Sequence, residues 1–411
     1  MTCRRLVFVG AGAVVVAVTS VSLAGQAPRG AAAPASTGAW TQPRTPWGDP
    51  DLQGLWRGFM VPLERPNQYK GREFLTDEEI ASRHTAQEDH AARTAAGNTY
   101  EFFFRAQANV NNIFHYDEKL APISRRTSQI IDPPNGRLPL LTQEAAKRWE
   151  AREAMTHGRG EADSWIDRGL SERCIEIFEP GRVSYWGLGE PPVDRPIKGL
   201  GSVEDASVGL EGGGITNRDD TGFVSSDSYR PVKRILQSPG FVAVLLHGSG
   251  GTNDVYRIVP LDGRRPFGPI VRQYQGSSRG HWEGGTLVIE TTNLNDAEPM
   301  MAVYGIRRYP GTRETLRVVE RYTRVDADHL EYRYTVEDPQ TYSRPYTSLE
   351  EFARDDAFVV APGLCHENNK DTGAQLSAAR ADEAAATDFG AEYAGVRRQR
   401  LDEVKAEVGL K

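Results

Sequence analysis

The sequence is poor in the residues that build metal clusters and disulfide scaffolds. Its 411 residues include only three cysteines, eight histidines and five methionines. No H-x-H, H-E-x-x-H or H-x₃-H spacing occurs, which excludes a local zinc motif of the finger or zincin type. A zinc site built from the distant His115, His281 and His366 stays open, so the sequence leaves the metal unknown.

The chain also lacks an excess of positive charge. The chain has 49 Lys and Arg against 56 Asp and Glu, a net charge of −7, and its basic residues are dispersed. This excludes the concentrated basic surface that binds nucleic acid. The glycine-rich stretches 212–214 and 248–251 lack a strand–loop–helix context and a following lysine, so we expect no phosphate loop and no organic cofactor.

The one long apolar run lies at the N-terminus. Two arginines precede an apolar stretch over residues 6–23, and small residues follow it. The pattern predicts a secretory signal peptide over residues 1–27 and an Ala/Pro/Gly/Ser-rich linker over residues 28–45, with a retained membrane anchor as the alternative. We expect a periplasmic or secreted protein with no stable membrane anchor after cleavage, and one β-rich domain over residues 46–411.

Removal of the signal peptide would leave two cysteines, Cys174 and Cys365. Two cysteines in an exported chain predict a disulfide bond, with two buried free thiols as the alternative. A cross-link between residues roughly 190 apart would restrict the unfolded chain by about 5 kcal/mol, if loop entropy alone is counted.

Strand-like runs separated by close turns fill the second half of the chain. The clearest, residues 329–337, places Leu330, Tyr332, Tyr334 and Val336 on one face and polar residues on the other, as in antiparallel sheets with one exposed face. Too few helices separate the runs for parallel crossovers. The predicted fold is mainly β: an antiparallel, calycin-like barrel or a strongly curved sheet. The predicted strands cover residues 51–56, 235–246, 255–261, 270–274, 286–292, 316–323 and 330–336, with a short strand before the Pro-Pro-Asn-Gly turn at 133–136.

Helices are predicted to decorate this sheet. Thr76 and Glu79 form a capping box that predicts a helix to about residue 95, and Thr142 caps a second helix to about residue 156. A helical tail is expected over residues 376–411. Residues 180–230 are rich in Gly, Pro and Asp without a sustained period, which predicts a long loop or insertion.

Residues 276–280, Gly-Ser-Ser-Arg-Gly, match the G-x-S-x-G pattern of serine hydrolases. That nucleophile elbow requires a strand before the serine and a helix after it. Gly284, Gly285 and the strand-like run that follows leave no room for the helix, so Ser278 is not expected to be a nucleophile. The stretch is predicted to be a tight connection between two antiparallel strands, with His281 and Trp282 presented at the mouth of a pocket.

The stretch GLCHENN is the best chemical candidate in the sequence. His366 can transfer protons near neutral pH and Glu367 adds a carboxylate, so both, together with His281, are the predicted catalytic residues. Asn368 offers an amide donor for a substrate oxygen. A disulfide at Cys365 would hold these side chains on a fixed frame; a tethered loop with ordinary polar residues is the alternative.

Further residues are predicted to bind a substrate. Asn112 and His115 lie where polar residues alternate loosely with aromatics, Arg257 and Arg272 supply cations for an anionic group, and Trp282 supplies an aromatic surface. Ordinary loop packing and ion pairs with the many carboxylates are the alternatives.

A series of segments runs through the whole chain in a fixed order. They are DLQGLW, PLERP, FLTDEE, SRRTSQIIDPPNGRLPLLT, LSERCIEIF, QSPGFVAVL, YRIVPLDGR, GSSRGHWEGGTLVIETTNL, VERYTRVDADHLEYRYTVEDPQTYSRPY and LCHENN. Together they resemble a family of secreted bacterial proteins, common in acidobacteria and proteobacteria and mostly labelled hypothetical. The resemblance implies secretion and one β-rich domain, and no reaction. Relatives usually carry Glu-x-x-His-Asp/Glu-x-Arg before the segment that reads IVPLDGR here; this chain keeps only Arg257, and Asp254 stands where the histidine would be.

Two main hypotheses follow for the function, and a structural cell-envelope protein is a third. The first is a periplasmic or secreted enzyme that acts on a small organic molecule by general acid–base chemistry, namely hydrolysis, elimination or isomerisation, without an organic cofactor. The second is a calycin-like protein that binds a small molecule and performs no chemistry. Converging titratable groups favour the enzyme, and a deep aromatic cup without them favours the binding protein. In both, the partner is a small molecule; the oligomeric state stays open.

Overall fold

The computed structural model describes residues 40–59, 61, 63–65, 69, 71–93, 122–155, 232–247, 255–296, 313–357, 377 and 401–410. The chain divides into two units, Met1–Trp40 and Thr41–Lys411, and the second unit holds every element described below. Within the described ranges, no helix is both long and apolar enough to cross a membrane.

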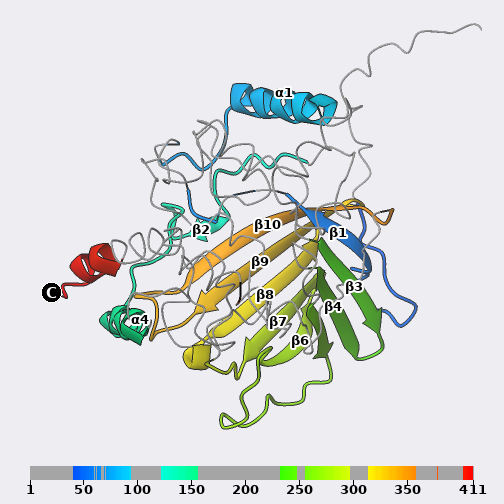
Figure 1. The fold of residues 1–411 in the computed structure, drawn as a ribbon. Helices are drawn as coiled ribbons and strands as arrows, with labels where there is room; N and C mark the ends of the chain where they lie inside the picture. Colours follow the sequence, from blue (N-terminus) through cyan, green and yellow to red (C-terminus); the bar gives the residue numbers. More distant parts are fainter. Residues whose placement is uncertain are drawn as a thin grey trace, which may run out of the picture. The chain divides into compact units, whose positions relative to one another are not determined.

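One antiparallel sheet dominates the second unit (Figure 1). Its strands follow the order β5-β4-β3-β1-β10-β9-β8-β7-β6, and β2 pairs with β10 beside this path. The strands are β1 (Gly54–Gly58), β2 (Ile130–Asp132), β3 (Val232–Ser238), β4 (Phe241–His247), β5 (Val255–Pro260), β6 (Ser277–Glu283), β7 (Thr286–Thr292), β8 (Arg317–Arg324), β9 (His329–Glu337) and β10 (Tyr346–Arg354). All their pairings are antiparallel.

The sheet is barrel-like and nearly closed, which confirms the predicted fold class. The two strands at its ends, β5 and β6, come back together at Gly280. A Cβ atom on this glycine would lie 2.6 Å from Leu261 Cδ2 and 3.0 Å from Val259 Cγ1. Gly280 therefore lets the side chains of β5 and the following loop pack directly against the backbone of β6.

The core lies on the inner face of this sheet. Residues that pair across strands share a face, and the inward rows are apolar along most of their length. In β9, Leu330, Tyr332, Tyr334 and Val336 are all buried, as the sequence alternation predicts. Trp56 of β1 is fully buried, and its Nε1 donates to the carbonyl of Leu52 at 2.9 Å. The burial of this inner face stabilises the curved sheet.

The described helices lie outside the sheet, and a 3₁₀ helix, η7 (Arg313–Thr315), precedes β8. α1 (Asp77–Arg93) begins with the predicted capping box: Glu79 N donates to Thr76 Oγ1 at 3.2 Å, and Thr76 N donates to a Glu79 carboxylate oxygen at 2.7 Å. Hydrogen bonds from Arg72 lower the pKa of Glu79 to about 2. α4 (Gln143–Met155) is capped by Thr142, whose Oγ1 accepts from Ala145 N. Residues 401–407 form a C-terminal helix.

The prediction of one strand over residues 235–246 is wrong, because this segment forms a hairpin of two strands. β3 ends at Ser238, Pro239 and Gly240 form the turn, and β4 starts at Phe241. Gly240 has φ 78°, a left-handed conformation that glycine adopts without steric cost. The sequence prediction ran across Pro239-Gly240, although this pair is itself a turn signal.

Two further predictions in the β5–β10 region are corrected. Residues 270–274 lie in the loop between β5 and β6, where Gln273 forms only an isolated bridge with Leu294. The stretch predicted to be a connection is itself strand β6, and the turn follows it at Gly284 and Gly285. The sequence analysis also missed β10, whose outward side chain of Leu349 is buried, so that no simple alternation marks the strand.

Candidate functional site

Among the described charged side chains that are buried on the inner face of the sheet, four form what we call the interior charge cluster: Lys233 of β3, Arg257 of β5, Glu320 of β8 and Glu350 of β10. Their residues are only 0–4% exposed. Each lies in an inward row: Arg257 pairs with Val244, and Glu320 pairs with Ile289 and Tyr334. Burying a charge is costly unless it is paired, so the two pairs in this cluster need a physical account.

Arg257 and Glu320 form a closely hydrogen-bonded pair. Arg257 Nη1 and Nη2 donate to the two oxygens of Glu320 at 2.5 and 2.9 Å, a bidentate contact. The hydroxyls of Tyr322 and Tyr332 donate to Glu320 Oε1 at 3.1 and 2.9 Å. Burial opposes the charge of Arg257, but the Glu320 carboxylate more than offsets it and raises the pKa of the guanidinium. Burial, reinforced by Glu320, raises the pKa of both tyrosines well above their usual value.

Lys233 and Glu350 form a pair whose hydrogen bonding is incomplete. Lys233 Nζ lies 3.6 Å from Glu350 Oε2, too far for a strong hydrogen bond. Its other neighbours are aromatic: the ring centres of Tyr332 and Phe352 lie 4.2 and 4.4 Å from the ammonium. Within the described part of the chain, Glu350 Oε1 and the Oγ of Ser348, two residues earlier on the same face, have no hydrogen-bond partner.

The pKa values of this pair move towards each other. Burial lowers the pKa of Lys233, against the opposing effect of Glu350 and Glu320. Burial raises the pKa of Glu350, against the opposing effect of Lys233. Both shifts favour the neutral amine and the protonated carboxyl. Perturbed titratable groups that share a buried site are candidates for proton transfer.

Of the predicted site residues, Arg257 and Trp282 face the interior. Arg257 belongs to the interior charge cluster. Trp282 lies in the inward row of β6, packs against the core and pairs with Leu287. Its Nε1 is buried without a hydrogen-bond partner among the described residues.

His281 lies on the opposite, outer face of β6. Its side chain is 59% exposed, and its Nε2 is 3.1 Å from Glu283 Oε1. Arg321 Nη2 donates to the other oxygen of Glu283 at 2.6 Å. These contacts, led by the one from Arg321, lower the pKa of Glu283. His281 is therefore part of an exposed ion-pair row and does not contact the interior charge cluster.

Arg272 and Ser278 have contacts that account for their positions. Arg272 Nη1 donates to the carbonyls of Glu314 and Leu294 at 2.7 and 3.3 Å, which ties the β5–β6 loop to the segment before β8. Ser278 is buried inside β6, and its Oγ is 2.8 Å from Thr291 Oγ1. A serine in mid-strand lacks the elbow geometry.

The remaining predicted site residues lie outside the described residues. They are Asn112, His115, His366, Glu367, Asn368, Cys174 and Cys365. The shared pocket of His366, Glu367 and His281 therefore stays a prediction, as does the disulfide bond.

The described residues contain no group of three or more His, Cys, Asp or Glu side chains that could hold a metal ion.

Comparison with protein-family models and with curated proteins finds no match for the chain. The candidate site is therefore defined by its own chemistry. Sequence reasoning missed Lys233, Glu320 and Glu350, although Glu320 and Glu350 each lie between two buried residues two positions away, and Lys233 lies two residues before the buried Ile235.

Proposed function

We propose that the protein is an exported enzyme that acts on a small organic molecule by general acid–base chemistry within the barrel-like sheet, with Lys233 and Glu350 as the proton-transferring pair. The supporting observation is that buried polar atoms of Glu350 and of the neighbouring Ser348 have no hydrogen-bond partner among the described residues. A buried polar group without a partner costs about 1–3 kcal/mol. Two such groups, Glu350 Oε1 and Ser348 Oγ, beside an ammonium with one long contact indicate a place for an additional molecule.

The pKa directions suit a base and an acid at neutral pH. The amine of Lys233 would take a proton from water or from a carbon next to a carbonyl group. The protonated Glu350 would give a proton to the oxygen that leaves or rearranges. One proton then returns from the ammonium to the carboxylate and restores the pair. This sequence fits elimination, isomerisation or hydrolysis, and such catalysis typically contributes about 10²–10⁴-fold.

The Arg257–Glu320 pair has a supporting role in this proposal. It is bidentate and buried, and it holds the hydroxyls of Tyr322 and Tyr332 in place. Tyr332 is also one of the two rings against Lys233. The Arg257–Glu320 pair would therefore hold the Tyr332 ring in position against Lys233.

A non-catalytic small-molecule binding protein is the second candidate. Its support is the aromatic layer of the inner face, where Tyr332 lies 4.6 Å from Tyr322, 5.3 Å from Tyr334 and 6.4 Å from Phe352, centre to centre. Such a layer suits the stacking of an apolar or glycosidic ligand. The titratable groups beside it favour the enzyme.

Export and the Cys174–Cys365 disulfide bond belong to the same proposal. They rest on the signal-peptide pattern and on the cysteine count after cleavage. A periplasmic or secreted enzyme would meet its substrate outside the cytoplasm.

Turnover by the purified full-chain protein tests the proposal. A panel of small hydroxy, carbonyl and ester compounds is incubated with the protein, and products are detected by mass spectrometry. Lys233→Met and Glu350→Gln should each lower turnover by about 10²-fold or more, whereas Arg234→Met, on the outer face next to Lys233, should not. Unchanged turnover in both inner-face variants would disprove the roles of the pair. Binding without turnover by the wild type would establish the second candidate, and His366→Ala tests the sequence-predicted residue in parallel.

A further inference from the structure

The loop between β5 and β6, residues 261–276, displays apolar side chains to solvent. Ile270 is 92% exposed, more than any other large hydrophobic side chain in the described residues, and Phe267 is 51% exposed. Val271 and Tyr274 are also exposed. Figure 1 shows this loop projecting beyond the ends of β5 and β6 at the lower end of the sheet.

Hydrogen bonds hold this loop in one conformation. The side chain of Asn293, after β7, donates from Nδ2 to the carbonyls of Phe267, Gly268 and Val271 at 3.1, 2.8 and 3.1 Å. The Gln273 amide donates to the Asn293 carbonyl at 2.9 Å. The exposed apolar tip is therefore anchored from β7, and it would need little ordering on binding.

The apolar surface continues onto the outer face of the adjoining strands. Leu236 of β3, Ala243 of β4 and Ile258 of β5 form one cross-strand row. Leu236 and Ile258 are mostly exposed, and Phe241 at the start of β4 is partly so. The guanidinium of Arg264, in the loop, lies 6.0 Å from the Phe241 ring and joins the two parts.

Arginines surround the loop tip. Arg279 lies over the Phe267 ring at 5.5 Å and donates to the carbonyl of Arg265. Among the described residues, neither Arg265 nor Arg279 has a carboxylate partner, whereas Arg264 is paired with Asp262. This concentration of positive charge stands out in a chain with a net charge of −7.

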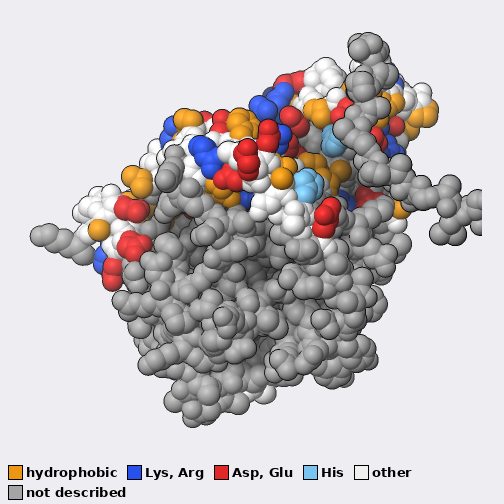
Figure 2. Space-filling view, turned by 90° about the horizontal axis from the view of Figure 1, so that it is seen from above, with side chains coloured by type: hydrophobic (Ala, Val, Ile, Leu, Met, Phe, Trp, Pro, Cys, Tyr) orange, Lys and Arg blue, Asp and Glu red, His pale blue; other side chains and the backbone are white. Residues whose placement is uncertain are grey.

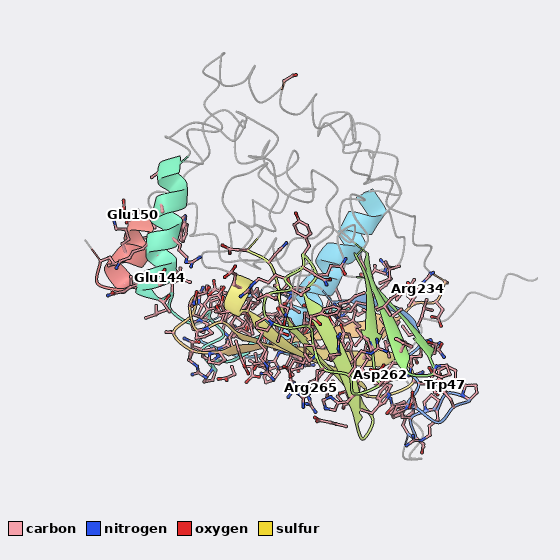
Figure 3. The ribbon with its side chains drawn as sticks, turned by 90° about the horizontal axis from the view of Figure 1, so that it is seen from below. Trp47, Glu144, Glu150, Arg234, Asp262 and Arg265 are labelled. Carbon is pink, nitrogen blue, oxygen red and sulfur yellow. The ribbon has the colours of Figure 1, made fainter. Side chains whose placement is uncertain are left out.

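Acidic side chains neutralise only part of this surface: Asp262 pairs with Arg264, Glu314 lies 3.8 Å from Arg272, and Glu290, opposite Arg279 on β7, pairs with Arg317. Figure 3 shows Arg265 far from Glu144 and Glu150 of α4. In the view from above, the described acidic and basic side chains are instead interspersed (Figure 2). The β5–β6 loop and the adjoining β6 thus combine an apolar tip with two guanidinium groups, those of Arg265 and Arg279, that have no carboxylate partner among the described residues.

We infer that this loop docks the protein on an anionic lipid surface. The apolar tip, formed by Phe267, Ile270, Val271 and Tyr274, enters the headgroup region, and the guanidinium groups of Arg265 and Arg279 contact the lipid phosphates. Docking of this kind is peripheral and needs no membrane-spanning segment.

Co-sedimentation of the full-chain protein with vesicles tests this inference. The probes are vesicles of phosphatidylcholine alone and of phosphatidylcholine mixed with phosphatidylglycerol, at low and high salt. We expect binding to the mixed vesicles that weakens with salt. Arg265→Gln and Arg279→Gln should each weaken it roughly fivefold, and Ile270→Asp about tenfold or more.

The matched control is Val325→Asp, which places the same charge on an exposed apolar residue at the β8–β9 turn. It should bind as the wild type does. Equal sedimentation with both vesicle types, or the same loss in Val325→Asp as in Ile270→Asp, would overturn the inference. So would a wild-type dimer that Ile270→Asp dissociates and that does not bind vesicles, because the loop would then be a protein interface.

Discussion

Lys233 Nζ of β3 and Glu350 Oε2 of β10 lie 3.6 Å apart, and both side chains are about 95% buried. Removal of one partner from a buried Lys–Glu pair leaves the other group buried without its partner, whereas replacement of both by apolar residues is often neutral or stabilising. We expect Glu350→Met to lower the free energy of unfolding by about 3–5 kcal/mol, and Lys233→Met/Glu350→Met to restore it or to exceed the wild type. Urea unfolding of the three proteins measures this.

The same double variant separates stability from function. If the pair is retained for chemistry, Lys233→Met/Glu350→Met should be stably folded and inactive. A double variant as unstable as Glu350→Met would show that the pair is required for packing and would contradict the expected rescue.

The pH dependence of stability should change when Lys233 is removed. Burial raises the pKa of Glu350 above its usual 4.5, and Lys233 opposes that rise. A carboxyl group with a raised folded-state pKa stabilises the fold fully below pH 4.5, and this contribution is lost as the pH rises through the folded-state pKa. The free energy of unfolding of Lys233→Met should therefore fall from pH 4.5 towards neutral, relative to Lys233→Met/Glu350→Met. Parallel pH profiles for the two variants would show that Glu350 is not the group responsible.

Arg257→Lys should be strongly destabilising, although it keeps the charge. A lysine ammonium cannot form the bidentate contact that Arg257 makes with Glu320. We expect a loss of about 2–4 kcal/mol, close to the cost of breaking a buried pair. Arg272→Lys is the control and should cost less than about 1 kcal/mol, because Arg272 is partly exposed. Thermal unfolding of both variants measures the difference, and equal losses would contradict it.

Ser278→Ala should keep wild-type turnover. Ser278 is buried in mid-strand beside Thr291, and His281 lies on the other face of β6. The lost hydrogen bond should cost about 1 kcal/mol of stability. A fluorophosphonate probe checks the chemistry independently: covalent labelling of Ser278 in the wild type would make it a nucleophile after all.

The disulfide prediction can be checked on protein recovered from the periplasm or the culture medium. Denaturation in an alkylating reagent without reductant, followed by mass spectrometry, should recover Cys174 and Cys365 in one cross-linked peptide pair. Cys174→Ser/Cys365→Ser should then unfold more easily, by up to about 5 kcal/mol. Two alkylated thiols in the unreduced wild type would contradict the bond.

The sheet could largely be predicted from local patterns, because strand alternation and turn residues act over a few positions. The predicted strand 286–292 is β7 itself, and both predicted helix caps form. The hairpin at Gly240 was missed although Pro239-Gly240 is a turn signal in the sequence. β10 was missed because residues 124–130 cover part of its outer face: Leu349 N donates to the Gln129 carbonyl, and Ser124 Oγ donates to Glu351.

The candidate site was less predictable, for a reason visible in β8. Its sequence, RVVERYTR, places Val318, Glu320 and Tyr322 on one face and Val319 and Arg321 on the other. Each face carries a charge and an apolar residue, so alternation cannot show which one is buried. Only Arg257 of the interior charge cluster was named in advance, as a cation that could clamp an anion.

By itself, the sequence determined the antiparallel, β-rich character of the chain, the helix starts and the unsuitability of Ser278 as a nucleophile, since each depends on residues within a few positions of one another. Only the tertiary structure decided that Lys233 meets Glu350, that Arg257 meets Glu320 and that His281 faces outwards. These relationships depend on the register of every strand between them and on the near closure of the sheet. A one-residue shift in register would turn each of these side chains to the other face.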